Sequence, residues 1–502
     1  MSKQVRVRFA PSPTGPLHIG GVRTALFNYL FAKKNNGVFY LRIEDTDQNR
    51  FVPGAEAYIM EALEWLGIAP SETVDKNEKF GPYRQSERKE IYKQYADQLI
   101  HSGWAYYAFD TAEALDAHRK QHEAEGKTFI YNWHNREKLD TSLVISKEAT
   151  DKRIAAGEDY VIRFKTPVNE TLHLHDIIRG DIKFETNLLD DKVLFKSDGM
   201  PTYHLANIVD DHLMETSHVI RGEEWLPSMP LHSLLYKAFN WEAPEFAHLP
   251  LILKPIGNGK LSKRDGDKMG FPVFPLEWKD ASSMTISSGY REKGFFPEAV
   301  VNFLALLGWN DGTEQEIFTL EELCEKFDLN RVHKAGAKFD PEKNKWFNHH
   351  YLQEQSDESL TKAFAPILIE KGISTQLDVT KIVSLIKERA NFVSEFWELS
   401  DYFFVAPTSY DEKAAKNWKE ETPNLMQQLI SVLENIRDFT SITIETIVKD
   451  WMTKNEIGMG KVMQPFRLSL VGTLKGPHLF DIIEVIGKEE TIKRLEKAIA
   501  SL

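Results

Sequence analysis

The sequence predicts an α/β domain that contains an α+β insertion and is followed by an all-α region. Three observations lead to this prediction. A strand–loop–helix–strand pattern fills the first fifty residues, helix and strand patterns mix over residues 87–191, and helical periodicity alone continues beyond about residue 330. A chain of 502 residues has room for about three to five domains of ordinary size.

The composition is that of a globular protein. Hydrophobic residues make up 42% of the chain and charged residues 27%, which excludes disordered and fibrous classes for most of its length. The net charge of −13 does not exclude nucleic acid as a partner, because binding depends on local charge. The single cysteine, Cys324, excludes an internal disulfide and suits a reducing compartment. No run of about 18 apolar residues and no signal or transit peptide is visible, so we expect a cytoplasmic protein with no membrane contact.

The first fifty residues predict two parallel strands joined by a helix. Apolar and arginine side chains alternate over Val5–Phe9, as in a strand, and apolar residues then recur at helical spacing from about Gly20 to Leu30. Gly37 is expected to cap this helix, and Val38–Ile43 has the pattern of a second strand. Such a unit implies a parallel pair, whose ligands bind beyond the carboxyl ends of the strands.

The later segments differ in their secondary-structure pattern. Residues 87–191 are interpreted as the insertion, with helices at Glu87–His101 and Thr111–Gly126 and strands at Tyr160–Thr166, Leu172–Asp176 and Asp181–Glu185. The sheet is expected to resume with strands at His218–Arg221 and Leu249–Leu253. The predicted divisions are residues 1–86 and 192–255 for the α/β domain, 87–191 for the insertion, 256–330 for a loop-bearing region and 331–502 for a helical domain.

The segment Arg8–Gly21 (RFAPSPTGPLHIGG) predicts an anion-binding turn. A strand ends in a Pro/Gly turn and His18 opens the helix, so the imidazole and the first helical amides can face one anionic group. Gly20 and Gly21 carry no side chain, which lets a flat ring or a phosphate approach the backbone. The alternative is an ordinary turn whose glycines serve only the backbone conformation, and it explains Gly20 alone better than the whole segment.

The segment Gly257–Gly266 (GNGKLSKRDG) predicts a basic loop. Over Lys254–Lys268, five basic residues stand against two acidic ones, and glycines flank the loop. Such a loop suits the negative charge that develops on a leaving polyphosphate. The alternative is a solvated surface loop, the usual role of a short charge run. The spacing of a Walker A loop is missing, which disfavours a P-loop nucleotide hydrolase.

Together these segments resemble the two signatures of class I aminoacyl-tRNA synthetases. His18–Gly21 (HIGG) resembles the first signature, usually written HIGH, and Lys260–Arg264 (KLSKR) resembles the second, usually written KMSKS. A resemblance to bacterial glutamyl-tRNA synthetases covers nearly the whole chain, with further similar strings at Arg42–Asp47, Gly81–Ser86, Pro201–Asn207, Val219–Trp225 and Met463–Arg467. It implies a Rossmann-like class I catalytic domain, an insertion that binds the tRNA acceptor end, a loop region that contacts the tRNA stem, and an all-α anticodon-binding domain.

The resemblance also implies an ATP-dependent ligase. It would activate L-glutamate to glutamyl-adenylate and transfer the glutamyl group to the 3′ end of tRNA(Glu), with Mg²⁺ entering alongside ATP. Neither step needs an enzyme nucleophile, so catalysis would rest on positioning and on charge stabilisation around phosphorus. His18 and Lys263 are the implied catalytic residues. The implied ATP-binding residues are His18, Gly20, Gly21, Lys260, Ser262, Lys263 and Arg264.

Seven residues are implied to bind glutamate: Arg8, Ala10, Ser12, Glu44, Tyr203, Asn207 and Arg221. By their chemistry, Arg8 and Arg221 suit the side-chain carboxylate and Glu44 suits the ammonium group. Tyr203 and Asn207 would supply neutral hydrogen bonds. The alternative is structural: the arginines would form salt bridges and Tyr203 a core contact, with partners among His204, Asp210, Asp211 and Glu223.

No metal site is expected. The residues His204, Asp210, Asp211 and His212 are of types that bind metals, but their spacing is irregular and no other region of the sequence supplies further ligands. Some family members carry a zinc knuckle in the insertion, whereas this insertion has no cysteine, so no zinc is expected. The resemblance further implies that Arg389 lies near a position that reads the third anticodon base; the alternative is a solvated helix face.

Four other functions compete with this interpretation. A truncated relative that glutamylates a modified base lacks an anticodon domain, and glutaminyl-tRNA synthetases carry β-barrels there, so the helical pattern argues against both. Small nucleotidyltransferases are usually short single domains. A non-catalytic RNA-binding or amino-acid-sensing paralogue is expected to have lost His18 or Lys263, and both are present. The family implies a monomer; the sequence leaves open whether tRNA(Gln) is also charged and whether activation needs tRNA.

Overall fold

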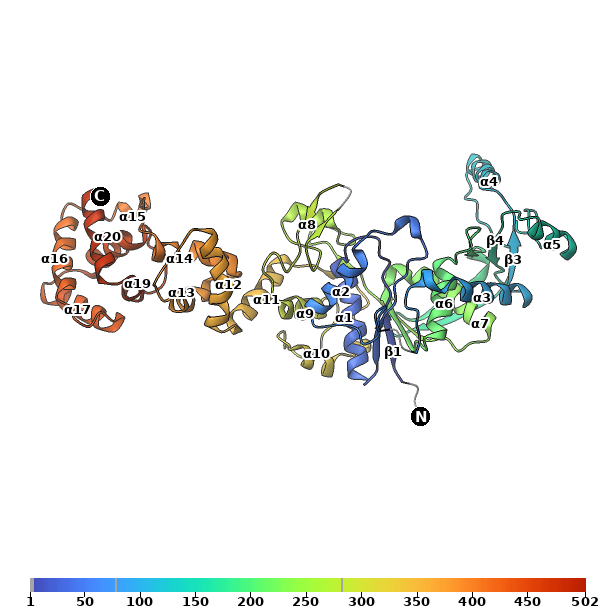
Figure 1. Ribbon diagram of the computed structural model, residues 1–502, viewed down its shortest axis with the longest axis horizontal. Helices are drawn as coiled ribbons and strands as arrows, with labels where there is room; N and C mark the ends of the chain where they lie inside the picture. The colour runs from blue at the N-terminus through green and yellow to red at the C-terminus, as the bar shows by residue number, and fades with distance from the viewer. Residues whose placement is uncertain (1–3, 77–78, 281–282) are drawn as a thin grey trace. The chain divides into compact units, whose positions relative to one another are not determined.

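The computed structural model describes residues 4–76, 79–280 and 283–502, and the chain forms two compact units (Figure 1). The first unit contains the residues up to Lys343, apart from Gly294–Phe296. Those three residues join Asn344–Leu502 in the second unit. The finer division of the chain, with boundaries at residues 86, 191, 255 and 330, remains a prediction, and residues 1–3 of the predicted α/β domain lie outside the described part.

Two pairs of parallel strands form the centre of the first unit. They are β1 (Arg6–Phe9) with β2 (Val38–Leu41), and β8 (His218–Gly222) with β9 (Glu245–Leu249). Ser217, which directly precedes β8, donates its backbone N–H to the Arg6 carbonyl at 2.9 Å and accepts the Arg6 N–H on its hydroxyl at 2.8 Å. The strand order is therefore β2–β1–β8–β9.

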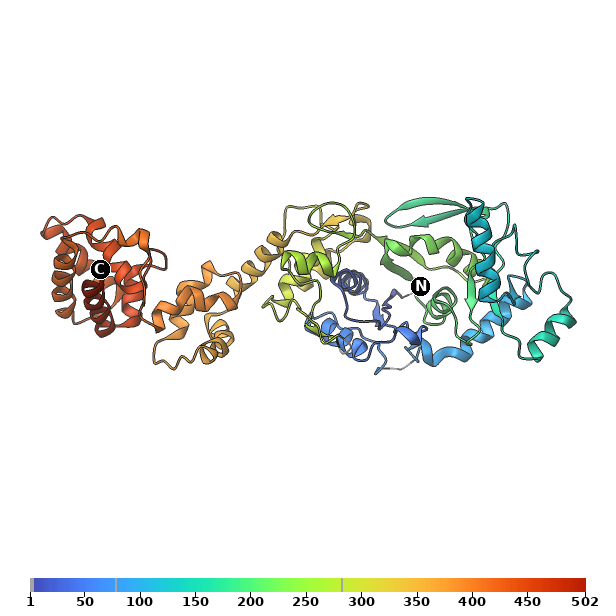
Figure 2. The same ribbon diagram turned by 90° about the horizontal axis from the view of Figure 1, so that it is seen from above.

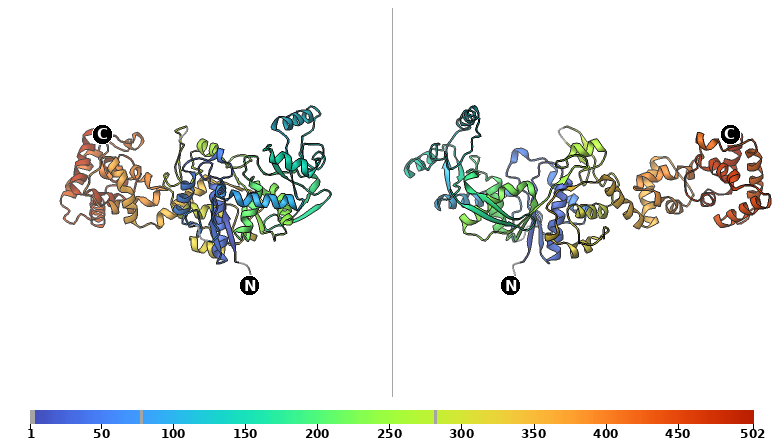
Figure 3. Two further views of the ribbon diagram at one scale, coloured as in Figure 1. Left: turned by 45° about the vertical axis from the view of Figure 1, so that its right-hand side comes forward. Right: turned by 180° about the vertical axis from the view of Figure 1, so that it is seen from behind.

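Helix α1 (Ile19–Lys34) connects β1 to β2 and confirms the predicted strand–helix–strand unit, which appears in blue in both views of Figure 3. Its end differs from the prediction. Asn36, not Gly37, has the left-handed backbone, with φ of 49°. Gly37 is required by close packing instead, because a Cβ there would lie 2.3 Å from the carbonyl oxygen of Val5.

Both faces of β1 are buried, although its arginines alternate with apolar residues. The side chains of Arg6 and Arg8 are almost completely enclosed. Arg6 pairs with Glu72 at 2.9 Å, and Arg8 pairs with Asp211 at 2.8 Å. Buried charges need such partners. The alternation therefore separates an apolar buried face from an ionic buried face.

The insertion contributes a long hairpin and two strands of a three-stranded antiparallel sheet, whose third strand lies just beyond the predicted boundary at residue 191. The sheet consists of β3 (Ala105–Ala108), β4 (Val161–Phe164) and β7 (Val193–Phe195), and the hairpin of β5 (Thr171–Asp176) and β6 (Gly180–Glu185), the paired teal-green arrows of Figure 2. Its helices are α3 (Lys89–His101), α4 (Ala112–Ala124) and α5 (Lys147–Ala155), and α6 (Tyr203–Leu213) follows.

Asp191 lies at the centre of the insertion, where no solvent reaches it. Its carboxylate accepts hydrogen bonds from the Tyr106 hydroxyl at 2.7 Å, the Thr166 backbone N–H at 3.1 Å and Arg136 Nη1 at 3.3 Å. Burial raises the pKa of Asp191, and these donors oppose the rise. The contacts tie β3, the end of β4 and the segment before β7 together in an insertion that has no cysteine.

The other elements of the first unit are α2 (Ala55–Trp65), α7 (Met229–Phe239), β10 (Ile252–Leu253), α8 (Lys263–Met269), β11 (Trp278–Lys279), β12 (Ile286–Ser287), α9 (Pro297–Leu306), α10 (Leu320–Lys326) and β13 (Ala337–Lys338). The strand predicted at Leu249–Leu253 is divided, because Pro250 has no N–H to donate. β9 ends just before it, and β10 begins two residues later.

The second unit is all-α, as predicted. The helices from its start onward are α11 (Pro341–Glu354), α12 (Asp357–Glu370), α13 (Val379–Ile386), α14 (Phe396–Phe404), α15 (Glu412–Ala415), α16 (Thr422–Glu434), α17 (Ser441–Lys454), α18 (Met459–Val471), α19 (Leu479–Ile486) and α20 (Lys488–Ser501). Their apolar faces share one core, which includes Phe364, Leu429 and Phe466. Among the described residues, no helix has the length and apolar character needed to cross a membrane.

We expect Asp191→Asn to loosen the insertion. Breaking a buried charge pair leaves Arg136 uncompensated, at a cost of about 3–5 kcal/mol. Amide hydrogen exchange of β3, β4 and β7 should accelerate, while exchange in the second unit stays unchanged. Asp181→Asn is the control, because the side chain of Asp181 is 92% exposed in the same insertion. Equal exchange in both variants would contradict a central role for Asp191.

Candidate active site

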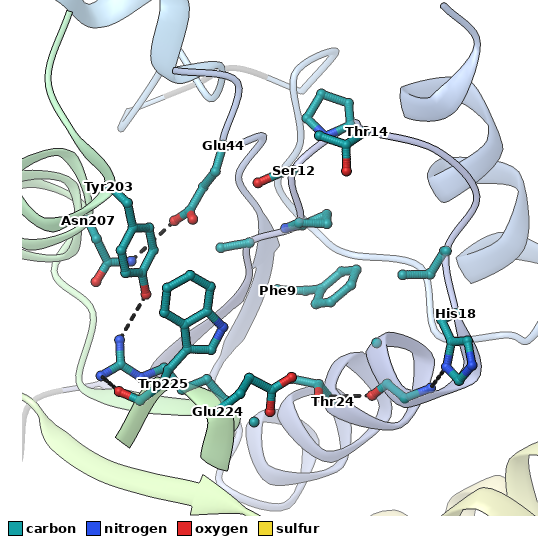
Figure 4. Close-up of a pocket in the computed structure, with 18 of the residues that line it drawn as sticks. Phe9, Ser12, Thr14, His18, Thr24, Glu44, Tyr203, Asn207, Glu224 and Trp225 are labelled. Carbon is teal, nitrogen blue, oxygen red and sulfur yellow. Dashed lines mark hydrogen bonds between the residues drawn. The ribbon is translucent and has the colours of Figure 1, made fainter. Parts of the chain in front are cut away.

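A cavity of about 700 Å³ opens beyond the carboxyl ends of β1, β2 and β8 (Figure 4). Its wall contains the loop after β1, the first turn of α1, the loop after β2, the start of α6 and the segment after β8. This is the position that parallel strands predict for a ligand. All seven residues predicted to bind glutamate line it: Arg8, Ala10, Ser12, Glu44, Tyr203, Asn207 and Arg221.

His18 caps the N-terminus of α1 with its side chain. Nδ1 accepts the backbone N–H of Gly20 at 3.1 Å, so a neutral imidazole carries its hydrogen on Nε2. Nε2 is buried and has no partner among the described residues. Burial, with a smaller contribution from the charge of Lys260, lowers the pKa of His18 to about 4. His18 therefore offers one neutral N–H donor at the edge of the cavity.

Lys263 shares a second cavity, of about 460 Å³, with His18 and Gly21. It is the first residue of α8, which Ser262 caps, and no carboxylate of the described residues lies within ion-pair distance of it. Lys260 differs, because its Nζ lies 2.7 Å from Glu224 Oε1 on the wall of the larger cavity.

The side chains of the basic segment therefore lie in different places. Of the predicted ATP-binding residues, Lys260 lines the larger cavity and Lys263 lines the smaller one. Ser262 and Arg264 line neither of the two. Ser262 instead donates its backbone N–H and its hydroxyl to the Asp265 carboxylate, at 2.9 and 2.5 Å, in the cap of α8, so its role in the structure is local.

The two glycines of the first segment have different reasons to be glycine. A Cβ on Gly21 would lie 2.7 Å from Leu17 Cδ1, so a larger residue here would require the Leu17 side chain to move. A Cβ on Gly20 would meet only His18 Nδ1, at 3.5 Å. Both glycines line the larger cavity, and the approach of a ligand to their backbone stays a prediction.

Arg42 is the centre of a buried ionic cluster. It donates to Asp211 at 2.7 Å and to Glu44 at 3.0 Å, and Arg8 donates twice to the same Asp211, at 2.8 and 3.0 Å. Burial lowers the pKa of Arg42, but the carboxylates outweigh it and hold that pKa well above its ordinary value. Burial raises the pKa of Asp211, and the arginines reverse this to a net lowering. Arg8, predicted to meet the substrate, thus has two of its nitrogens on Asp211.

Arg221 is buried in a different way. Its Nη1 donates to the Tyr203 hydroxyl at 2.9 Å, a bond drawn in Figure 4, and lies 3.3 Å from His232 Nδ1. Its Nε lies 3.0 Å from His248 Nε2. No carboxylate of the described residues lies within ion-pair distance of this guanidinium, although Glu223 is two residues away in sequence. A ligand carboxylate can therefore pair with it directly.

Glu44 and Asn207 offer acceptors to the same cavity. Asn207 Nδ2 donates to Glu44 Oε1 at 3.2 Å, as Figure 4 shows, which leaves Asn207 Oδ1 buried without a described partner. Burial raises the pKa of Glu44, and the charge of Arg42 opposes the rise. Two acceptors side by side suit an ammonium group, which has three N–H donors.

The candidate metal ligands of α6 have other partners. Asp210 and Asp211 are ion-paired with arginines, and His204 Nδ1 lies 3.2 Å from His232 Nε2. The ring of His212 stacks on a tryptophan, with centroids 3.7 Å apart. Within the described ranges, no group of three or more His, Cys, Asp or Glu side chains is arranged to hold a metal ion.

Several residues of the cavity wall have no role predicted from the sequence. Trp225 lies over Tyr203, with ring centroids 4.2 Å apart, and Glu224 holds Lys260. Both belong to the string Val219–Trp225, whose similarity to the synthetases was the available signal. His248 had no such signal, because nothing in its local sequence pattern marks it.

Arg389 lies in a short 3₁₀ turn of the second unit, next to two unsatisfied polar groups. The Tyr402 hydroxyl and Arg467 Nη1 are buried without described partners. Burial lowers the pKa of Arg467, and the charge of Arg389 lowers it further. The sequence predicted only Arg389 here; the structure adds a second arginine and a phenol to the same place.

We expect His18 to stay neutral at physiological pH. Its lowered pKa, about 4, follows from burial of the ring, so the imidazole should remain unprotonated from about pH 8 down to about pH 5.5. NMR of protein labelled at its histidine carbons measures this, with the His18 signal assigned from a His18→Gln variant. A midpoint between about pH 6 and pH 7 would contradict the enclosed position of the ring.

Comparison with known proteins agrees with this geometry. A family model described as class I tRNA synthetases (E and Q), catalytic domain, matches residues 4–346, and an anticodon binding domain model matches residues 347–499. A glutamate–tRNA ligase of Flavobacterium johnsoniae is 84% identical with 100% of both chains covered, and that of Phocaeicola vulgatus is 57% identical, covering 100% of this chain and 99% of its own. A crystal structure of a glutamate tRNA ligase from Elizabethkingia meningosepticum, in complex with its amino acid, is 54% identical, covers 100% of both chains and has a TM-score of 0.97. These matches confirm the predicted fold class, and the chain belongs to the glutamate–tRNA ligase family of class I synthetases.

Proposed function

We propose that this chain joins L-glutamate to the 3′ end of tRNA(Glu), using ATP. The observation that carries the proposal is Arg221, a buried guanidinium that neutral groups hold against the cavity with no carboxylate partner among the described residues. The side-chain carboxylate of glutamate supplies the missing partner. Glu44 and Asn207 supply acceptors for the ammonium group. The pair of subsites fits an acidic amino acid.

In the first step, an oxygen of the glutamate α-carboxylate attacks the α-phosphorus of ATP, and the bond to the bridging oxygen of pyrophosphate breaks. ATP enters as its Mg²⁺ complex, as a substrate. His18 and Lys263, which line the same smaller cavity, would donate from Nε2 and Nζ to phosphate oxygens while negative charge moves onto the pyrophosphate. Lys260, Gly20 and the first turn of α1 support the nucleotide from the larger cavity.

In the second step, a ribose hydroxyl of the terminal tRNA nucleotide attacks the carbonyl carbon of glutamyl-adenylate, and AMP leaves. Residues 87–191 are the proposed site of the acceptor end, and residues 256–330 are proposed to contact the stem. The all-α second unit is proposed to bind the anticodon, with Arg389 in contact with it. The proposal includes a monomer that works in the cytoplasm.

Selection against glutamine follows from the same guanidinium. A carboxamide brings no negative charge, so glutamine leaves Arg221 buried and uncompensated, whereas a carboxylate pairs with it. Sites that pair a specific polar group reject analogues that lack it by large factors. A non-catalytic RNA-binding or amino-acid-sensing role is disfavoured, because it would need neither His18 nor Lys263.

Lys263→Ala should reduce glutamate-dependent exchange of pyrophosphate into ATP by about 100-fold to 1000-fold, since one charged donor to the leaving group is lost. Exchange is measured with and without tRNA. Lys147→Ala is the matched control, because Lys147 is also the first residue of a serine-capped helix but lines neither cavity. Exchange that does not depend on glutamate, or equal rates in the two variants, would refute the proposed chemistry.

Arg389→Ala should raise the KM for tRNA(Glu) by about tenfold and leave the KM for glutamate within about twofold. The reason is that Arg389 lies in the second unit, whereas the glutamate subsites lie in the first. Aminoacylation kinetics with varied tRNA measure the effect, and Arg437→Ala, an exposed arginine of the second unit, is the control. An unchanged KM for tRNA would contradict the proposed contact between Arg389 and the anticodon.

A further inference from the structure

Asp176 and His248 form a buried chain behind Arg221. Asp176 ends β5 and His248 lies on β9, and neither side chain is exposed. Asp176 Oδ2 lies 2.7 Å from His248 Nδ1, and His248 Nε2 lies 3.0 Å from Arg221 Nε. The chain therefore runs from the hairpin of the insertion, through one imidazole, to the guanidinium that faces the cavity.

The direction of each hydrogen bond follows from Arg221. A guanidinium can only donate, so His248 Nε2 must accept, and the imidazole carries its hydrogen on Nδ1. That hydrogen is donated to Asp176, whose oxygens also accept the backbone N–H groups of Ile178, Arg179 and His248. Because every neighbour of this carboxylate is a donor, an acceptor-only side chain is required here, and it selects the tautomer that Arg221 needs.

His248 is neutral in this arrangement. Burial lowers its pKa, Asp176 raises it, and the charges of Arg221 and Arg179 lower it again, with a net lowering. These three are the charged groups that face the ring, and the ring of Phe246 lies parallel to it. A protonated ring would direct an N–H at the Nε–H of Arg221.

The other arginines of the site are neutralised by direct contact with a carboxylate, whereas Arg221 is not. Arg8 and Arg42 contact Asp211 directly, and that carboxylate neutralises them. A carboxylate in direct contact would also hold Arg221, but it would occupy the guanidinium and cancel the charge that a ligand must meet. The imidazole of His248 is oriented by Asp176 and in turn orients Arg221. The carboxylate of Asp176 is separated from the guanidinium by the width of the ring.

We infer that Asp176 and His248 are positioning residues, which orient the guanidinium of Arg221 for the side-chain carboxylate of the amino acid and leave its charge available. The inference rests on the proposed function and deepens it. According to this inference, Asp176 and His248 contribute to the preference for glutamate over glutamine although neither residue contacts the amino acid.

Two variants of His248 test the inference. His248→Leu removes both hydrogen bonds, whereas His248→Gln keeps them, because a carboxamide oxygen accepts from Arg221 and its NH₂ group donates to Asp176. We expect His248→Leu to raise the KM for glutamate by about tenfold to 100-fold and to reduce the preference for glutamate over glutamine, with the KM for ATP unchanged. His248→Gln should stay within about threefold of the parent protein.

Equal changes in the KM for glutamate and for ATP, or no advantage of glutamine over leucine at this position, would overturn the inference. Nitrogen NMR of the parent protein gives a test that needs no variant. The hydrogen of His248 should be on Nδ1, and a hydrogen on Nε2 would overturn the inference even if His248→Leu fails to fold. A parent protein without glutamate-dependent exchange would refute the proposed function instead, and the tautomer measurement separates the two failures.

Discussion

The contact between Arg42 and Asp211 is the constraint on which the first unit depends. It joins the end of β2 to α6 across 169 residues of sequence, with 2.7 Å between Nη1 and Oδ1. Removing both charges from water offsets most of their attraction, so the pair adds little net stability, but losing one partner leaves a buried charge at a cost of about 3–5 kcal/mol. We interpret the pair as a device that sets where α6 meets the sheet rather than how strongly it is held.

The cavity wall continues from this pair. Arg8 shares Asp211 with Arg42, Glu44 shares Arg42 with Asp211, and Asn207 bonds to Glu44. One side of the cavity is thus built from charges that compensate one another. Arg221 differs, because its partners are two imidazoles and a phenol, which carry no negative charge. A negatively charged ligand group can therefore neutralise it. The same residue type therefore serves structure or recognition according to whether a carboxylate is already in contact with it.

The features that could be predicted from the sequence are those that depend on residues close to one another in the chain. The strand–helix–strand unit and the position of His18 at the start of its helix depend on neighbouring residues, and the sequence predicted both. The choice between side-chain partners across long distances was not visible: Asp211 was one of several possible partners for the arginines, and it binds Arg8 across 203 residues of sequence but does not bind Arg221. The role of Arg8 in binding glutamate stays a prediction. Gly37 could be read as a cap because its close approach to Val5 depends on strand pairing. The role of His248 depends on partners in β5 and β8, so no local pattern could indicate it.

The pairing of β1 has a consequence for synthesis of the chain. β2 and Glu72, the carboxylate partner of Arg6, follow soon after β1, but Ser217 and Asp211, which bond to Arg6 and Arg8, come more than 200 residues later. Until then, Arg8 remains without its carboxylate partner, and a long loop has still to close. The nascent chain can therefore pair β1 with β2 early, but the other edge of β1 is completed only after the segment before β8 has been made.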